Sequence, residues 1–183
     1  IIGAGALSLH FARAHQAVRP IGRVLICNRS RDKAVAVAEQ LRGEGINAEA
    51  SDMEAAVRQA DIVSGITGST VALIKGAWLK PGTHVDLAGA FKPTMRETDG
   101  DAVGMASVFV DTRDGALAEA GDLIQAQAEG KFDFADVKGD LFDLTQGRSR
   151  GRQNGREITL FKSCGTALED LATAVMVHLR TRQ

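Results

Sequence analysis

Ile1-Ile2-Gly3-Ala4-Gly5-Ala6-Leu7-Ser8 opens the chain, and this stretch decides the fold that we expect. Two β-branched residues, a turn with two glycines and a helical pattern after it predict a strand-to-helix turn of the dinucleotide-binding type. Gly3 would permit the tight turn, and Gly5 would let backbone N–H groups approach a pyrophosphate at the helix N-terminus. Ser8 stands where a third small residue lets the helix pack closely on the strand. The predicted cofactor-binding residues of this turn are Gly3, Ala4, Gly5, Ala6, Leu7 and Ser8.

The loop Asn28-Arg29-Ser30 follows the next apolar run, where a dinucleotide site reads the adenosine ribose. An acidic residue there would bind the ribose 2′-hydroxyl of NAD, and this loop has none. Arg29 can instead contact a 2′-phosphate and stack on adenine, while Ser30 can donate a hydrogen bond. Asn28, Arg29 and Ser30 are therefore predicted to bind the cofactor, with NADP(H) preferred and NAD(H) as the alternative. In the competing interpretation, Arg29 is only an exposed residue that begins a helix.

Short apolar runs alternate with helical patterns along the rest of the chain, which predicts an α/β fold with a doubly wound, mostly parallel sheet of the Rossmann type. Strands are expected over residues 23–27, 46–50, 60–66, 84–89, 106–110 and 158–161. Helices are expected over residues 6–18, 30–43, 52–59, 115–127, 133–144 and 166–182. Only Ile1 and Ile2 precede the first glycine, whereas a strand in this position runs for about five residues. We therefore expect the first strand to be truncated and the chain to be part of a longer protein.

Small polar residues follow the predicted strand 60–66, in the order Thr67-Gly68-Ser69. The carboxyl ends of parallel strands line the cofactor crevice in this fold, so these residues are predicted to lie against the ribose or the nicotinamide. Gly89, which ends the strand 84–89, is also predicted to bind the cofactor. The alternative for Thr67-Gly68-Ser69 is an ordinary turn.

Composition limits the class of partner. The chain has 183 residues and a net charge of −1, which gives no electrostatic reason to expect nucleic acid or an anionic membrane. The apolar runs are too short to cross a bilayer, and no signal-peptide pattern opens the chain. Two cysteines fit a reducing compartment, so we expect a cytoplasmic protein. The four histidines show no metal-ligand spacing, and no metal is expected.

The stretch Gly155 to Ala172 closely resembles the signature of the ornithine cyclodeaminase/mu-crystallin family. The blocks Gly76–Val85 and Gly89–Glu97 resemble further segments of that family, and the likeness covers essentially the whole chain. The resemblance implies a Rossmann domain, here residues 1–163, joined to a substrate and dimerisation domain that is mainly absent from this chain. Residues 164–183 would form the C-terminal helix that returns to that second domain. It also implies a homodimer through the missing N-terminal half, and an amino or imino acid substrate whose carboxylate ligands lie in that half.

Chemistry varies within the family that this chain resembles. Cyclodeaminases carry a catalytic Asp just after the strand equivalent to 85–88, whereas this chain has Gly89-Ala90-Phe91-Lys92. That departure and the loop Asn28-Arg29-Ser30 favour an NADP(H)-dependent reductase of cyclic imino acids, such as 1-pyrroline-2-carboxylate. The alternatives are an NAD-dependent ornithine cyclodeaminase, an alanine dehydrogenase, and a non-catalytic NADPH-dependent binding protein.

Three residues are the catalytic candidates: Lys162, Ser163 and Asp111. Lys162 and Ser163 follow the last predicted strand, close to the expected nicotinamide. Ser163, Gly165 and Thr166 are also predicted to bind the cofactor, because a turn that opens a helix presents backbone N–H groups. The alternatives are a structural salt bridge for Lys162 and a helix N-cap for Thr166. For Asp111, a cap on the helix from Thr112 onward is the favoured alternative.

Overall fold

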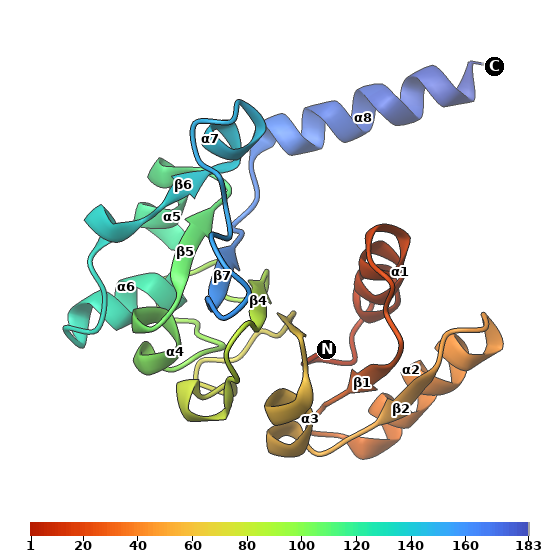
Figure 1. Cartoon of the computed structure of the whole chain (residues 1–183). Coiled ribbons are helices and arrows are strands. Elements are labelled where there is room, and N and C mark those ends of the chain that lie inside the picture. Colours follow the sequence, from red (N-terminus) through yellow and green to blue (C-terminus); the bar gives the residue numbers. More distant parts are fainter. Residues whose placement is uncertain (183) are drawn as a thin grey trace.

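The computed structural model describes residues 1–182, which form a layered α/β fold (Figure 1). The strands are β1 (Val24–Ile26), β2 (Ala48–Ala50), β3 (Ile62–Gly65), β4 (His84–Leu87), β5 (Ser107–Val110), β6 (Gly139–Asp140) and β7 (Thr159–Lys162). The α-helices are α1 (Ser8–Val18), α2 (Arg31–Gly43), α3 (Met53–Gln59), α4 (Gly100–Gly104), α5 (Arg113–Glu119), α6 (Gly121–Ala128), α7 (Leu141–Thr145) and α8 (Ala167–Thr181). Two 3₁₀ turns lie at Gly76–Trp78 and Phe134–Asp136.

Every strand pair in the sheet is parallel. One group has the order β3-β4-β7-β5-β6 and the other is β1-β2. Ile2 forms bridges to both Cys27 and Gly65, so the opening residues lie between β1 and β3 and join the two groups. The chain runs from Ile2 to β1 and β2 on one side, and then crosses to β3 on the other. Ile2 therefore marks a switch point, at which ligands bind in folds of this kind.

The core consists of two apolar clusters, one on each side of the Ile2 position. The first joins α1 and α2 to β1 and includes the fully buried Ile26 and Leu41. The second surrounds the larger sheet and includes the fully buried Val85 and Leu160. Such apolar strands are typical of a parallel sheet that is covered on both faces. The expected fold class is confirmed.

Two predicted helices were wrong in detail. The expected helix 115–127 is two helices, because Gly121 touches another segment: a Cβ there would overlap the carbonyl oxygens of Lys92 and Met95. The expected helix 133–144 is a 3₁₀ turn, the short strand β6 and then α7. The start of α7 is fixed by Asp140, whose side chain forms a reciprocal capping box with Asp143.

Helix α8 extends away from the sheet, and none of its residues is buried (Figure 1). Its exposed side chains include Leu168, Leu171, Val175, Met176 and Leu179. An amphipathic helix of this kind carries an apolar stripe without a partner in the described part of the chain. No helix within residues 1–182 is both long and apolar enough to cross a membrane.

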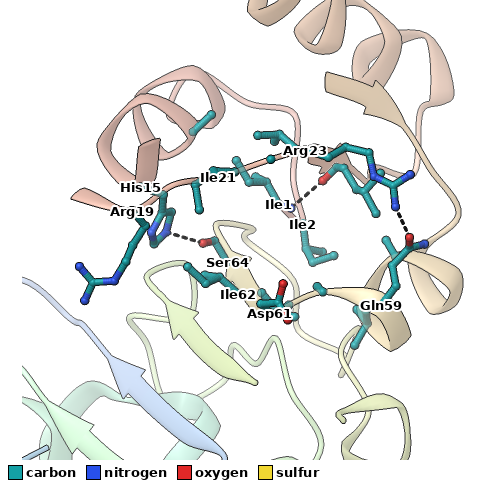
Figure 2. A pocket seen from close by; sticks show the side chains of 18 of the residues that line it. Ile1, Ile2, His15, Arg19, Ile21, Arg23, Gln59, Asp61, Ile62 and Ser64 are labelled. Carbon is teal, nitrogen blue, oxygen red and sulfur yellow. Dashed lines mark hydrogen bonds between the residues drawn. The ribbon is translucent and has the colours of Figure 1, made fainter. Parts of the chain in front are cut away.

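A cavity of about 500 Å³ lies between β1 and β3 (Figure 2). It begins on the amino-terminal side of Ile1, whose nitrogen donates to Leu25 O at 2.7 Å. Because Ile2 pairs with both flanking strands, the gap between β1 and β3 on the amino-terminal side of Ile1 is one strand wide. His15 of α1 points across it toward Ser64, with 2.9 Å between Nε2 and Oγ. This cavity is at the opposite end of Ile1-Ile2 from the glycine turn, so it is separate from the predicted cofactor site.

Candidate functional site

The glycine turn has the geometry that its sequence predicts. Gly3 has φ of 115°, and a Cβ there would lie 3.1 Å from Ile66 Cγ1 and O, so the turn needs glycine. Gly5 is exposed, and a Cβ there would meet no atom within 4 Å. Buried Ser8 donates from Oγ to Gly5 O at 2.8 Å and to Gly3 O at 3.1 Å. Ser8 therefore packs helix α1 close to the strand and also ties the turn together.

The N-terminus of α1 follows this turn at the carboxyl edge of the sheet. Its N-cap residue, Leu7, makes no side-chain cap bond, and no acidic residue lies in the first turn. An uncapped helix N-terminus presents backbone N–H groups and a partial positive charge to an anion. Together with the open space at Gly5, this geometry fits a pyrophosphate.

The loop after β1 leaves polar side chains at the same edge. Asn28 Nδ2 donates to Ser30 O at 3.1 Å, which holds the loop. Arg29 is exposed and makes no ion pair with any of the residues described. Ser30 is the N-cap residue of α2, but its side chain makes no cap bond. The Arg29 guanidinium and the Ser30 hydroxyl are therefore available to a ligand.

The loops after β3 and β4 are held by a residue that the sequence did not single out, Glu97. Its Oε1 accepts from Thr67 N–H at 2.6 Å, and its Oε2 accepts from Gly89 N–H at 2.8 Å. The Glu97 side chain is fully buried, and this burial raises the pKa of its carboxyl group. Ser69 Oγ donates to Val71 O at 2.7 Å, so Thr67-Gly68-Ser69 is fixed at both ends. Glu97 lies in a loop without periodicity, and no spacing in the sequence signals its role.

Asp111, which follows β5, is buried beneath the loop after β7. Its Oδ2 accepts from Cys164 N–H at 2.6 Å, Gly165 N–H at 2.7 Å and Ser163 Oγ at 3.2 Å. The expectation that Asp111 caps the next helix was wrong: Thr112 is the N-cap of α5, because its side chain accepts from Gly115 N–H. Asp111 holds the 163–165 loop in place.

Thr166 is the N-cap of α8, as its alternative interpretation predicts. Its Oγ1 accepts from Glu169 N–H at 3.3 Å, and Glu169 Oε2 accepts from Thr166 N–H at 3.2 Å. This reciprocal pair is a capping box, and it fixes where α8 begins. Gly165, just before it, has φ of 85°, a conformation that favours glycine.

Lys162 is fully buried, with its ammonium below the loops rather than at their surface. Its Nζ lies 3.8 Å from Asp122 Oδ2 and 3.5 Å from Leu87 O. This geometry agrees with the structural salt bridge. Its partner Asp122, for which no sequence pattern predicts a role, is also fully buried.

Burial affects the thiol beside this site. It raises the pKa of Cys164 to about 11. We therefore expect Cys164 to hold about 100-fold less thiolate at pH 8 than an exposed cysteine and to react slowly with iodoacetamide. In a Cys27→Ser background, the alkylation rate should still rise about ten-fold per pH unit up to pH 10. A rate that levels off below pH 9 would contradict the expectation.

No group of three or more His, Cys, Asp or Glu side chains within the described residues is placed to hold a metal ion. The polar groups of the carboxyl edge come instead from five adjacent positions of one parallel sheet: Ile2, β1, β3, β4 and β7. A doubly wound sheet with a glycine turn at its switch point defines a Rossmann-type fold.

A model of the ornithine cyclodeaminase/mu-crystallin family matches residues 1–183. The chain belongs to this family.

Named relatives agree with this assignment. The Delta(1)-pyrroline-2-carboxylate reductase of Paracoccus denitrificans is 45% identical over 176 residues, which cover 95% of this chain and 56% of the relative. The Thermococcus litoralis Delta(1)-pyrroline-2-carboxylate reductase, solved in complex with NADH and L-proline, has a TM-score of 0.91 and 34% identity, covering 94% of this chain and 54% of that one. An archaeal alanine dehydrogenase dimer with bound NAD has a TM-score of 0.91 and 29% identity, covering 96% and 54%. This chain thus spans about half the length of the curated relatives that it matches.

Proposed function

We propose that this chain is the dinucleotide-binding part of an NADP(H)-dependent oxidoreductase that reduces a cyclic imino acid such as 1-pyrroline-2-carboxylate. The observation that carries the proposal is the carboxyl edge of the sheet, where an uncapped helix N-terminus, the free Arg29 and the fixed loops after β3, β4 and β7 come together. The similarity to two pyrroline-2-carboxylate reductases supports the choice of reaction.

The switch point sets the orientation of the cofactor in this proposal. The pyrophosphate lies over Gly3–Ser8 at the N-terminus of α1, and the adenine half lies over Asn28-Arg29-Ser30 on the β1 side. The nicotinamide half then lies over Thr67-Gly68-Ser69 and Gly89, with Ser163, Gly165 and Thr166 beyond them. When bound, the reduced nicotinamide would supply a hydride to the carbon of the protonated imine (the iminium), which gives the neutral amine.

In this proposal the residues of this chain orient the nicotinamide and the substrate. Ser163 is half-buried beside this edge, so it is our candidate for direct contact with the nicotinamide or the substrate. Lys162 and Asp111 are buried below the loops, and we assign them to positioning rather than to contact with the substrate. Asp111 holds the N–H groups of the loop that carries Ser163, and a fixed loop preserves the geometry of hydride transfer.

The loop after β4 favours a reductase over a cyclodeaminase. Residues 89–92 carry no carboxylate that could act as a general base. The side chains in this loop are instead an aromatic ring and a cation: Phe91 is 48% exposed, and Lys92 Nζ lies 5.8 Å from the centre of its ring.

The whole protein is expected to oxidise NADPH when it is given 1-pyrroline-2-carboxylate, followed by NADPH fluorescence. The same preparation should release no ammonia from ornithine and should not oxidise alanine. Ammonia release without imine reduction would assign the cyclodeaminase, and alanine oxidation would assign the dehydrogenase. Tight NADPH binding without turnover on any of these substrates would leave a binding protein.

The domain organisation is a second part of the proposal. Residues 1–163 are the Rossmann domain, and the exposed apolar stripe of α8 supports a role for 164–183 in packing on a second domain of the whole protein. We place the homodimer contacts and the substrate-carboxylate ligands in that second domain, and the whole protein in the cytoplasm.

A further inference from the structure

The buried carboxylate of Glu97 joins the ends of two neighbouring strands. It accepts Thr67 N–H at 2.6 Å and Gly89 N–H at 2.8 Å. Both N–H groups lie beyond the last backbone bond between β3 and β4, which runs from Ala88 N–H to Gly65 O. We propose that Glu97 is a positioning residue, which fixes the separation of the Thr67 and Gly89 loops and so shapes the nicotinamide end of the site. The inference rests on the proposed function, because that function places the nicotinamide there.

Two glycines make room for this carboxylate. A Cβ on Gly65 would lie 3.0 Å from Glu97 Cδ. A Cβ on Gly89 would overlap the backbone of Thr67 and crowd Glu97 as well. The two loops therefore approach each other closely, with the carboxylate as the acceptor for N–H groups that would otherwise be buried without partners.

Asp122, at the start of α6, holds the Glu97 segment from the other side. Its Oδ1 accepts from Glu97 N–H at 2.6 Å and from Thr98 N–H at 2.9 Å. Its Oδ2 has no hydrogen-bond partner within the described chain and lies 3.8 Å from Lys162 Nζ. Lys162 is thus a buried cation beside Asp122. The network connects the end of β7 to the ends of β3 and β4, so three loops of the site share one support.

A positioning role and a merely structural role predict different binding losses. The Glu97 bonds reach only the loops after β3 and β4, whereas the adenine half lies over the loop after β1 in our proposal. Loss of the Glu97 bonds should therefore weaken binding of the whole dinucleotide and leave binding of its adenine half unchanged. A general loss of stability would weaken both.

Glu97→Gln in the whole protein tests this difference. An amide keeps the size of the side chain but has one oxygen, so it can accept only one of the two N–H groups. We expect the dissociation constant of the preferred dinucleotide to rise about ten-fold, and that of its adenine half (AMP or adenosine 2′,5′-bisphosphate) to change less than about two-fold. The control is Glu129→Gln, because Glu129 is an exposed carboxylate paired with Arg96 in the same region. It should leave both constants unchanged.

Hydrogen exchange gives a readout without cofactor. In the wild type, the amides of Thr67 and Gly89 should be protected although they lie outside the strands, and Glu97→Gln should speed exchange of one or both by about ten-fold. Rapid exchange of both amides in the wild type would overturn the proposal even if the variant did not fold. Equal losses for dinucleotide and adenine half, or no loss, would also overturn it. A wild type that binds no dinucleotide would instead overturn the proposed function, while the exchange result would still decide whether the Glu97 bonds form.

Discussion

Asp111→Ala is expected to lower the free energy of unfolding by about 3 kcal/mol and to remove most of the reductase activity. The substitution leaves Cys164 N–H, Gly165 N–H and the Ser163 hydroxyl without their shared acceptor. Each partly buried donor without a partner costs about 1–3 kcal/mol, less whatever water recovers. The loop that carries Ser163 would then be free to move, which would disturb the nicotinamide end of the site. Urea denaturation and the rate of NADPH oxidation measure the two effects.

Asp114→Ala is the matched control for this variant. Asp114 is an exposed carboxylate in the first turn of α5, so its loss should cost less than about 1 kcal/mol, through the helix dipole alone. If Asp111→Ala unfolded at the same urea concentration as Asp114→Ala, the carboxylate would not be holding the loop. Full stability with lost activity would instead assign Asp111 the catalytic role for which its sequence position makes it a candidate.

The fold could be predicted because its determinants are local. Gly3 and Gly5 specify a turn, and apolar runs such as 23–27 specify buried parallel strands. The broken helix at Gly121 could not be predicted in this way. The helix pattern continues through this position, and the break depends on the carbonyl groups of Lys92 and Met95, which only the tertiary structure brings there.

The residues of the candidate site also fall into those with a local sequence signal and those that depend on the tertiary structure. Residues that a ligand would meet at loop tips, such as Arg29 and Ser30, stand next to strand ends and were predicted from that position. Glu97 supports the loops after β3 and β4, and Asp122 supports the segment that carries Glu97. Both act through backbone N–H groups that lie 8 to 30 residues away in the chain. Backbone donors have no sequence signature. Lys162 stands at the end of a strand, and that position alone predicts a residue of the reacting site. In the structure its ammonium is instead buried beside Asp122.

Arg29→Ala is expected to reduce the preference of the whole protein for NADPH over NADH by about 10- to 100-fold. The proposed cofactor seat places the exposed Arg29 guanidinium against the 2′-phosphate, which NADH lacks. Hydrogen bonds to a charged partner contribute about 1.5–3 kcal/mol each, which corresponds to this range. The loss should appear in the dissociation constant of NADPH, while that of NADH should change little. Fluorescence titration of both nucleotides measures the ratio.

Arg31→Ala separates a direct contact from a general positive field. Arg31 is also exposed and begins α2, but it stands outside the Asn28-Arg29-Ser30 loop. Its loss should weaken NADPH binding by less than about three-fold, and added salt should remove the difference, because the interactions of exposed charges are screened. The effect of Arg29→Ala should persist in salt, since a bidentate contact with phosphate is short and directional. Equal effects of the two variants, or a NADPH to NADH ratio that Arg29→Ala leaves unchanged, would remove the physical basis for NADP(H) and leave NAD(H) as the cofactor.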